Sequence, residues 1–278
     1  MSLFVFLSVL AAALLHASWN ALIKAGADRI AMMMVLSAVQ GVIGLMVVAT
    51  QSLPEAKVLP WLAASGLIHS VYKLFLTFAY EHGDLSRVYP LARGTAPMIT
   101  LVAGGLWLGE LVTTIETLGI LVLGIGILLL ARGVWTSGES GKLLPFAFGS
   151  ACTTAGYTLV DGLGARLAAS ATQYVGWLFV IDGVIFAAAM LALRGRMALP
   201  GSGRVWVLGG FAAAASYASY AVAVWAMTQA PIALVAALRE TSILFAVAIG
   251  WVAFGERMTK AKAVSVAMIA CGVILTRL

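Results

Sequence analysis

Most of this chain consists of apolar segments about as long as a membrane-spanning helix, and the polar stretches between them are short. An α-helix needs roughly 20 apolar residues to cross the hydrocarbon core of a bilayer, and its backbone groups are then hydrogen-bonded within the helix. The sequence therefore predicts an all-α polytopic membrane protein with ten transmembrane helices. The predicted segments are Leu3–Ile23, Ile30–Thr50, Leu59–Tyr80, Val88–Leu108, Thr113–Ala131, Leu143–Val160, Tyr174–Leu193, Val205–Met227, Ile232–Phe254 and Ala263–Thr276.

The composition argues against several other classes of protein. Of the 278 residues, 62% are hydrophobic and 10% are charged, whereas about 25% of residues are charged in soluble domains. The net charge of +6 is spread along the chain, so no basic patch indicates nucleic-acid binding. Cys152 and Cys271 lie in apolar runs without metal-ligand spacing, and we expect no cofactor or metal site. The first segment has no basic residue before Lys24, so we interpret it as a mature helix rather than a signal peptide.

The two halves of the chain match each other without a gap at a shift of 146 residues (239 − 93 = 146). Arg93 then falls on Arg239, and Gly109–Glu110 falls on Gly255–Glu256. Apolar matches carry little information in such a chain, but Arg and Glu are rare within it. The match therefore predicts an internal repeat.

We predict a first five-helix repeat over residues 1–131, a linker rich in Gly and Ser over residues 132–142, and a second repeat over residues 143–278. Because each unit has an odd number of helices, the second is inserted upside down relative to the first. Inverted repeats are typical of secondary transporters, whose substrate site lies where the repeats meet.

In each predicted repeat the fourth helix ends in Gly-Glu, within LWLGE (Leu106–Glu110) and VAFGER (Val252–Arg257). Together with the two five-helix units, this pattern resembles the drug/metabolite transporter superfamily, EamA type, over essentially the whole chain. The resemblance implies a transporter of small metabolites in the bacterial cell inner membrane, with cytoplasmic termini and export as the favoured direction. The segment His16–Lys24 (HASWNALIK) is similar to the opening of members associated with phosphonate utilisation. That similarity implies uptake of a phosphonate-type or related zwitterionic metabolite as the alternative.

Polar residues recur at spacings of three or four positions in the first and third predicted helices, and so share one face of each helix. Ionisable residues in membrane helices are costly and normally face the bundle interior, where they mark substrate pathways. We therefore interpret both stripes as candidate lining of a pathway, and hydrogen bonding between packed helices is the alternative. The residues are His16, Trp19 and Asn20 in the first helix and His69, Tyr72 and Lys73 in the third.

Arg93 lies between two prolines, Pro90 and Pro97, in the fourth predicted helix. Pro97 has no N–H to offer the carbonyl of Arg93, so we expect this helix to bend where its charge lies. The repeat mate Arg239 is followed directly by Glu240. Both guanidinium groups are candidate substrate contacts, and the alternative is that they extend toward the lipid headgroups.

Asp182 lies in the middle of the seventh predicted helix. We interpret it either as a counter-ion to a buried cation or as a proton-coupling group. Lys73, Arg93 and Arg239 outnumber Asp182 and Glu240 among these deep residues. A net cationic cavity favours a substrate with an anionic group, such as an amino acid or an organic anion.

Tyr217 and Tyr220 in the eighth predicted helix are candidate contacts for the apolar or ammonium part of that substrate, and the alternative places them in the core. The predicted function is secondary-active transport of a small metabolite, with the lipid bilayer as partner and coupling to protons as one option. The chain has no G-x-S-x-G and no H-E-x-x-H, so an intramembrane enzyme is disfavoured. A channel is left open, as is the oligomeric state.

The orientation of the chain has two conflicting indicators. Eleven Lys and Arg residues fall in the predicted loops opposite the termini, and three fall on the terminal side. The positive-inside rule would then place both termini outside. We keep the cytoplasmic termini that the resemblance implies, because an error of one helix would invert half of the loops.

Overall fold

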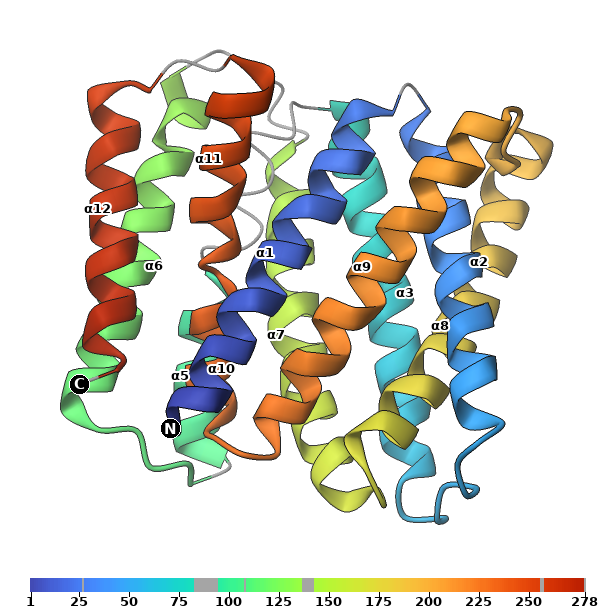
Figure 1. Cartoon of the computed structure of the whole chain (residues 1–278), viewed down its shortest axis with the longest axis horizontal. Coiled ribbons are helices and arrows are strands. Elements are labelled where there is room, and N and C mark those ends of the chain that lie inside the picture. Colours follow the sequence, from blue (N-terminus) through green and yellow to red (C-terminus); the bar gives the residue numbers. More distant parts are fainter. Residues whose placement is uncertain (27, 83–94, 108, 137–142, 256–257, 278) are drawn as a thin grey trace.

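The computed structural model describes the chain apart from residues 27, 83–94, 108, 137–142, 256–257 and 278. Every secondary-structure element that it describes is a helix, and the long helices run side by side (Figure 1). The elements are α1 (Leu3–Ala25), α2 (Arg29–Val48), α3 (Leu59–His82), α5 (Ala96–Trp107), α6 (Thr114–Thr136), α7 (Leu143–Leu167), α8 (Ala171–Arg194), the 3₁₀-helix η1 (Gly195–Ala198), α9 (Gly203–Met227), α10 (Ile232–Arg239), α11 (Ser242–Phe254) and α12 (Lys260–Leu275).

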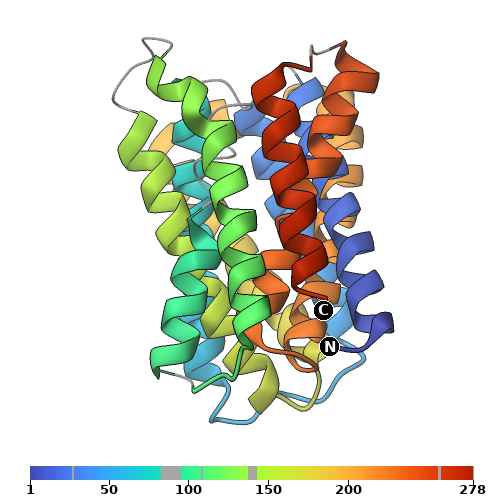
Figure 2. The same cartoon turned by 90° about the vertical axis from the view of Figure 1, so that its left-hand side faces the viewer.

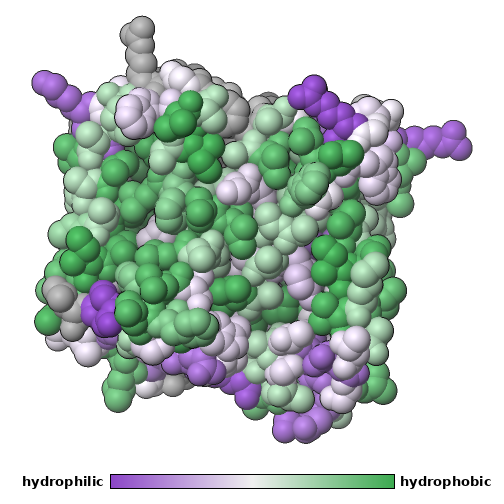
Figure 3. All heavy atoms as spheres, in the orientation of Figure 1, coloured by the Kyte–Doolittle hydropathy of each residue, from purple (hydrophilic) through white to green (hydrophobic). Residues whose placement is uncertain are grey.

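The surface of the bundle is suited to a bilayer. Figure 3 shows hydrophobic side chains over the middle of the visible face and hydrophilic ones toward its upper and lower ends. The prediction of an all-helical, multi-pass membrane protein is confirmed. Ten crossings stay a prediction, because much of the fourth predicted segment lies outside the described residues. Among the described residues, five stretches are long and apolar enough to cross a membrane: Leu3–Ile23, Ile30–Val48, Ala171–Arg194, Gly203–Met227 and Ile232–Ala253.

The helices pack in a pattern that follows the sequence repeat. At a shift of 146 residues (239 − 93), α1 corresponds to α7, α2 to α8, α3 to α9 and α6 to α12. The most extensive contacts are those of α2 with α8 and α6 with α12, which join equivalent helices, and those of α3 with α7 and α1 with α9, which exchange under the repeat. Equivalent helices also run in opposite directions, as α6 and α12 do in Figures 1 and 2. The packing therefore fits two inverted repeats related by an approximate two-fold axis.

Glycines let the backbones of equivalent helices touch. A Cβ atom on Gly272 in α12 would lie 2.7 Å from the carbonyl oxygen of Gly119 in α6. A Cβ atom on Gly44 in α2 would lie 2.6 Å from the carbonyl oxygen of Gly176 in α8. In lipid, where hydrophobic burial does not drive helices together, such close packing at small residues holds them in contact.

The glycine of each repeated Gly-Glu pair has a backbone conformation that favours glycine. Gly109 has φ of 61° and Gly255 has φ of 65°, and each lies just beyond the end of a helix. This left-handed region is open to glycine because it has no Cβ, and it commonly ends helices. A glycine in the left-handed conformation therefore follows both α5 and α11, at positions 146 residues apart (255 − 109).

An ion pair joins the two repeats at the side of the bundle that carries both termini (Figure 1). Glu110 Oε1 lies 2.8 Å from Arg166 Nη2, and Glu110 Oε2 accepts a hydrogen bond from the N–H of Ile232 at the start of α10 (2.8 Å). Arg166 also donates to the carbonyls of Met227 and Ala230. These contacts tie α7 and the loop before α10 to the end of α5.

The ninth predicted segment, Ile232–Phe254, is not one continuous helix, which corrects our prediction. The chain tightens at Glu240 and Thr241, whose N–H groups donate to carbonyls three residues back (3.0 and 3.1 Å), the 3₁₀ pattern. The Thr241 hydroxyl also donates to the carbonyl of Leu238 (2.7 Å), and such side-chain bonds compete with the helical ladder. The segment is therefore divided into α10 and α11, with the division directly after Arg239.

Two helices, α6 and α7, extend well beyond their predicted ends. The sixth predicted segment ends at Val160, whereas α7 continues to Leu167 and carries Asp161 within the helix. Similarly, α6 extends to Thr136, so the first residues of the predicted linker over 132–142 are helical. Residues 137–142 lie outside the described part of the chain.

We expect Gly272→Ala to lower the thermal unfolding temperature of the purified protein, because its Cβ would collide with the Gly119 carbonyl. Overpacking of this kind costs about 1–3 kcal/mol. The matched control is Gly210→Ala in α9, whose Cβ would meet nothing within 4 Å, and alanine there gains roughly 0.5–1 kcal/mol of helix stability. Equal unfolding temperatures for the two variants would contradict the close α6–α12 contact.

Both ends of the chain emerge on the same side of the bundle (Figure 1), so we expect an even number of membrane crossings. A reporter that is active only in the cytoplasm should give the same signal when fused before Met1 and after Leu278. Opposite signals from the two fusions would show that the chain crosses an odd number of times.

Candidate functional site

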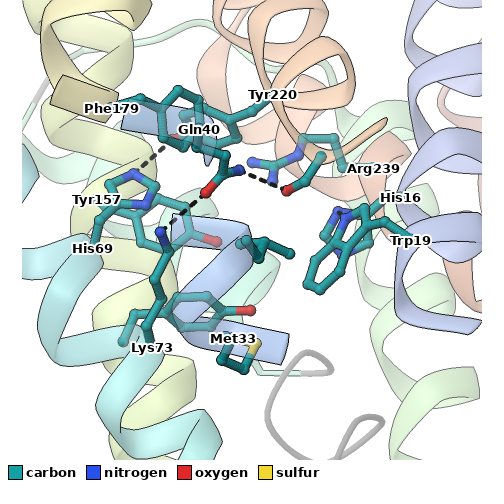
Figure 4. A pocket seen from close by; sticks show the side chains of 13 residues that line it. His16, Trp19, Met33, Gln40, His69, Lys73, Tyr157, Phe179, Tyr220 and Arg239 are labelled. Atoms are coloured by element: carbon teal, nitrogen blue, oxygen red, sulfur yellow. Dashed lines mark hydrogen bonds between the residues drawn. The ribbon is translucent and has the colours of Figure 1, made fainter. Parts of the chain in front are cut away.

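A cavity lies where α1, α2, α3, α7, α8, α9 and α10 meet, so both repeats contribute to it (Figure 4). Its wall is mainly apolar and aromatic with a few polar groups among the lining residues, which is the usual form of a small-molecule site. The lining residues are His16, Trp19, Met33, Leu36, Gln40, His69, Tyr72, Lys73, Tyr157, Phe179, Ser216, Tyr220 and Arg239.

Lys73 is the centre of one polar network in this region. Its Nζ forms an ion pair with Asp182 and donates to Ser37 Oγ and Gln40 Oε1, both at 3.0 Å. The hydroxyl of Ser70 donates to the other carboxylate oxygen of Asp182 (3.2 Å). Asp182 is fully buried and Lys73 is 4% exposed. Asp182 therefore occupies the position of a counter-ion, and it neutralises Lys73 before any substrate binds.

Asp161 on α7 is the centre of the second network and is also fully buried. The hydroxyls of Tyr220 and Tyr174 both donate to its carboxylate, the latter at 3.1 Å. His69 Nε2 lies 2.9 Å from Asp161 Oδ2 and 3.2 Å from the Tyr220 hydroxyl. The His69 ring stacks on Tyr157 with 4.1 Å between centroids. The buried Asp161 carboxylate therefore accepts from two tyrosine hydroxyls and also contacts the imidazole, so both of its oxygens have hydrogen-bond partners.

Arg239 is the last residue of α10 and lines the cavity directly beside the α10–α11 division. It is 6% exposed, and its guanidinium carbon lies 5.0 Å from the centre of the Tyr220 ring. Within the described part of the chain, no carboxylate lies within ion-pair distance of it. In Figure 4, Arg239 and Lys73 converge on the space around Gln40. A buried cation without a carboxylate partner is costly in a membrane, and an anion in the cavity would offset that cost.

The first helix contributes two side chains to the wall. Trp19 Nε1 donates to His16 Nδ1 (3.3 Å), and both residues line the cavity. Asn20 is buried but donates to the carbonyl of His16 (2.8 Å) and does not line the cavity. Tyr217 on α9 packs against Phe179, 5.1 Å between centroids, and also stays outside the lining.

The structure brings most of the sequence-predicted site residues together. Asp182 and Glu240 are buried near the cavity without lining it. Arg93, with the bend predicted beside it, lies outside the described residues. The predicted residues that do line the cavity are His16, Trp19, His69, Tyr72, Lys73, Tyr220 and Arg239.

Asp161 is the most consequential residue that our sequence analysis missed. We ended the sixth segment at Val160 because a charged residue followed it. Thr154, Tyr157 and Asp161 are spaced by three and four positions, so a stripe search extended by one turn would have found them. Gln40 had a similar signal, since it lies three residues after Ser37.

We expect Lys73→Met and Asp182→Asn each to destabilise the protein by about 3–5 kcal/mol, because either leaves one buried charge without its partner. The double variant should lose much less than the sum, and a thermal unfolding cycle measures this difference. Lys57 and Glu55, an ion pair with side chains 57% and 67% exposed, provide the control, since exposed pairs contribute only about 0–1 kcal/mol. Additive losses for Lys73 and Asp182 would contradict the buried pair.

Comparison with known proteins agrees with the repeat and with the architecture. A solved structure titled "Crystal structure of protein" is 16% identical, with a TM-score of 0.74 over 99% of this chain and 98% of that one. At this identity the likeness shows the fold alone. A search of curated proteins found no match.

The family model described as "EamA-like transporter family" matches residues 3–132 and again residues 142–278, so the two matches cover the two predicted repeats. Members of this family are membrane transporters of small molecules, which agrees with a helical bundle that has an apolar surface and an internal cavity lined by aromatic side chains and a few polar ones. The chain therefore belongs to the EamA-like transporter family of the drug/metabolite transporter superfamily.

Proposed function

We propose that this transporter is a secondary-active carrier of a small metabolite with an anionic group, such as an amino acid or an organic anion. The observation that carries the proposal is Arg239, a buried guanidinium at the cavity wall with no carboxylate partner among the described residues. A guanidinium binds carboxylate or phosphonate oxygens through paired, charge-assisted hydrogen bonds. Of the predicted cations, Lys73 is already neutralised by Asp182. We therefore propose Arg239 as the main contact for the anionic group.

The rest of the cavity suits the remainder of such a substrate. Trp19, Tyr72 and Phe179 present aromatic surface to the same space as Arg239. Aromatic faces accommodate apolar groups and also attract ammonium groups. A zwitterion would place its acid group at Arg239 and its ammonium group against these rings.

Alternating access suits this architecture better than a permanent pore. Transporters built from inverted repeats bind substrate where the repeats meet, commonly beside a discontinuous helix. Here the cavity takes residues from both repeats, and Arg239 lies at the division between α10 and α11. Counterflow separates the two classes, because a carrier is stimulated by substrate on the opposite side and a channel is not.

Direction and location complete the proposal. We place the protein in the bacterial cell inner membrane with cytoplasmic termini, and we propose export, as the family resemblance implies. Uptake of a phosphonate-type metabolite is the alternative, because a guanidinium suits a phosphonate as well as a carboxylate. Accumulation assays with substrate offered from either side distinguish the two directions.

We expect a thermal-shift screen to identify acidic compounds that raise the unfolding temperature, because a ligand that binds only the folded state stabilises it. The panel contains glutamate, methylphosphonate, putrescine and glucose. Arg239→Gln should abolish the shift by an acidic compound and reduce its counterflow at least tenfold, which is about 1.4 kcal/mol of binding free energy. Arg239→Lys should retain part of the thermal shift and of the counterflow, since the positive charge remains and only the planar pair of donors is lost.

Arg277→Gln is the matched control, because Arg277 is exposed near the end of the chain. It should leave both the thermal shift and counterflow unchanged. Stabilisation by putrescine or glucose alone, or acidic ligands that bind Arg239→Gln as tightly as the wild type, would contradict an anion site at Arg239.

A further inference from the structure

We infer that the substrate carries a second oxygen acceptor in addition to its acid group, and that the Ser216 hydroxyl on α9 binds this acceptor. The inference rests on the proposed function, because it names a further group on a substrate whose acid group lies at Arg239. It follows from a hydrogen-bond path through the cavity wall that fixes which side chains can donate to a bound molecule. The path is formed by Asp182, Lys73, Gln40 and Ser216, in that order.

The ammonium group of Lys73 has no N–H left for a substrate. Lysine has three N–H donors and no acceptor. These donors reach the Asp182 carboxylate, Ser37 Oγ and Gln40 Oε1, the last two at 3.0 Å. Lys73 lines the cavity, but while these bonds are intact it affects the hydrogen bonding of a substrate only through its neighbours.

Lys73 fixes the orientation of the Gln40 amide. Because an ammonium group can only donate, the amide must present its oxygen to Lys73, and its nitrogen is left for Ser216. Gln40 Nε2 donates to Ser216 Oγ at 3.0 Å. In Figure 4 the oxygen end of Gln40 points toward Lys73 and its nitrogen end toward the side of Arg239. Gln40 is 1% exposed, so bulk water does not compete for either end of the amide.

Ser216 accepts this N–H and keeps its own proton for another partner. Among the described residues, its hydroxyl has no acceptor. By contrast, Ser8, Ser18 and Ser70 each donate to the carbonyl four residues earlier in their helices. Ser216 is half-buried and lines the cavity, so its O–H is available to a molecule in that space.

The cavity therefore offers two chemically different donors. Arg239 has charged N–H groups that suit an anionic group, whereas Ser216 has a neutral O–H that suits a carbonyl, amide or hydroxyl oxygen. A buried donor that finds no acceptor is costly. The site consequently favours acids that carry such an oxygen over plain aliphatic acids. Ser216 is a binding residue in this arrangement, and Gln40 is a positioning residue that acts through it.

The second acceptor is tested with pairs of compounds that match in charge and length. Pyruvate is compared with propionate, and glutamine with norvaline, in thermal-shift titrations of the purified protein. In at least one pair, we expect the compound with the extra oxygen to bind about three- to tenfold more tightly, as the net contribution of one hydrogen bond implies. Ser216→Ala should remove this preference, and Ser216→Thr, which keeps a hydroxyl, should retain it.

The positioning role of Gln40 is tested with Gln40→Leu, which removes the N–H that holds Ser216. The Ser216 hydroxyl can then turn to the carbonyl four residues earlier. We expect the ratio of affinities within the pair to fall toward one, with little change for the compound that lacks the extra oxygen. A purely structural role for Gln40 would weaken both compounds alike. Combining Gln40→Leu with Ser216→Ala should lower the ratio no further than Ser216→Ala alone, because both changes remove the same contact.

Ser219→Ala is the matched control. Ser219 lies on the same helix, donates to the carbonyl of Ala12 (2.7 Å) and does not line the cavity, so this variant should leave the ratio unchanged.

Equal binding within both pairs, in a protein that binds these acids through Arg239, would overturn the inference and leave the proposed function intact. A preference that survives Ser216→Ala would also overturn it. Failure of all four compounds to bind would exclude the substrate class named here. The titrations with glutamate and methylphosphonate would then decide whether the proposed anion site fails as well.

Discussion

Lys73 and Asp182 form an ion pair inside a bundle whose exterior is apolar, and the arrangement of the cavity depends on it. Either charge alone would be costly at this depth, so the pair holds α3 against α8. Ser37 and Gln40 on α2 complete the hydrogen bonding of the ammonium group. With this charge satisfied, Arg239 is the cation at the cavity wall that has no carboxylate partner among the described residues.

The repeat supplies the scaffold, and the departures from it supply the site. Equivalent helices pack symmetrically, with glycines at the contacts between α2 and α8 and between α6 and α12. At the shift of 146 residues (239 − 93), His69 corresponds to Ala215, Lys73 to Ser219, and Asp161 and Asp182 to Leu15 and Leu36. Arg239 alone among these charged residues has a charged equivalent, Arg93. The charged residues of the two polar networks are therefore not repeated at the equivalent positions of the other repeat.

Hydropathy and the 146-residue match (239 − 93) were sufficient to predict the helical membrane architecture, the repeat and the two polar stripes. They were sufficient because bilayer insertion and helical periodicity act locally along the chain. The same local reasoning ended the sixth segment before Asp161 and made one helix of α10 and α11. Lys73 and Asp182 are 109 positions apart, so their pairing depends on how α3 packs against α8, which no local pattern contains. The division at Glu240 depends on side-chain hydrogen bonds that hydropathy does not register.

The central claim is that the cavity holds the acid group of its substrate at Arg239. It is tested most directly by determining an experimental structure with glutamate or methylphosphonate bound. We expect the carboxylate or phosphonate oxygens to lie within hydrogen-bond distance of the Arg239 guanidinium, with the Lys73–Asp182 pair intact. A bound anion that instead takes Lys73 away from Asp182, or that lies outside this cavity, would contradict the account.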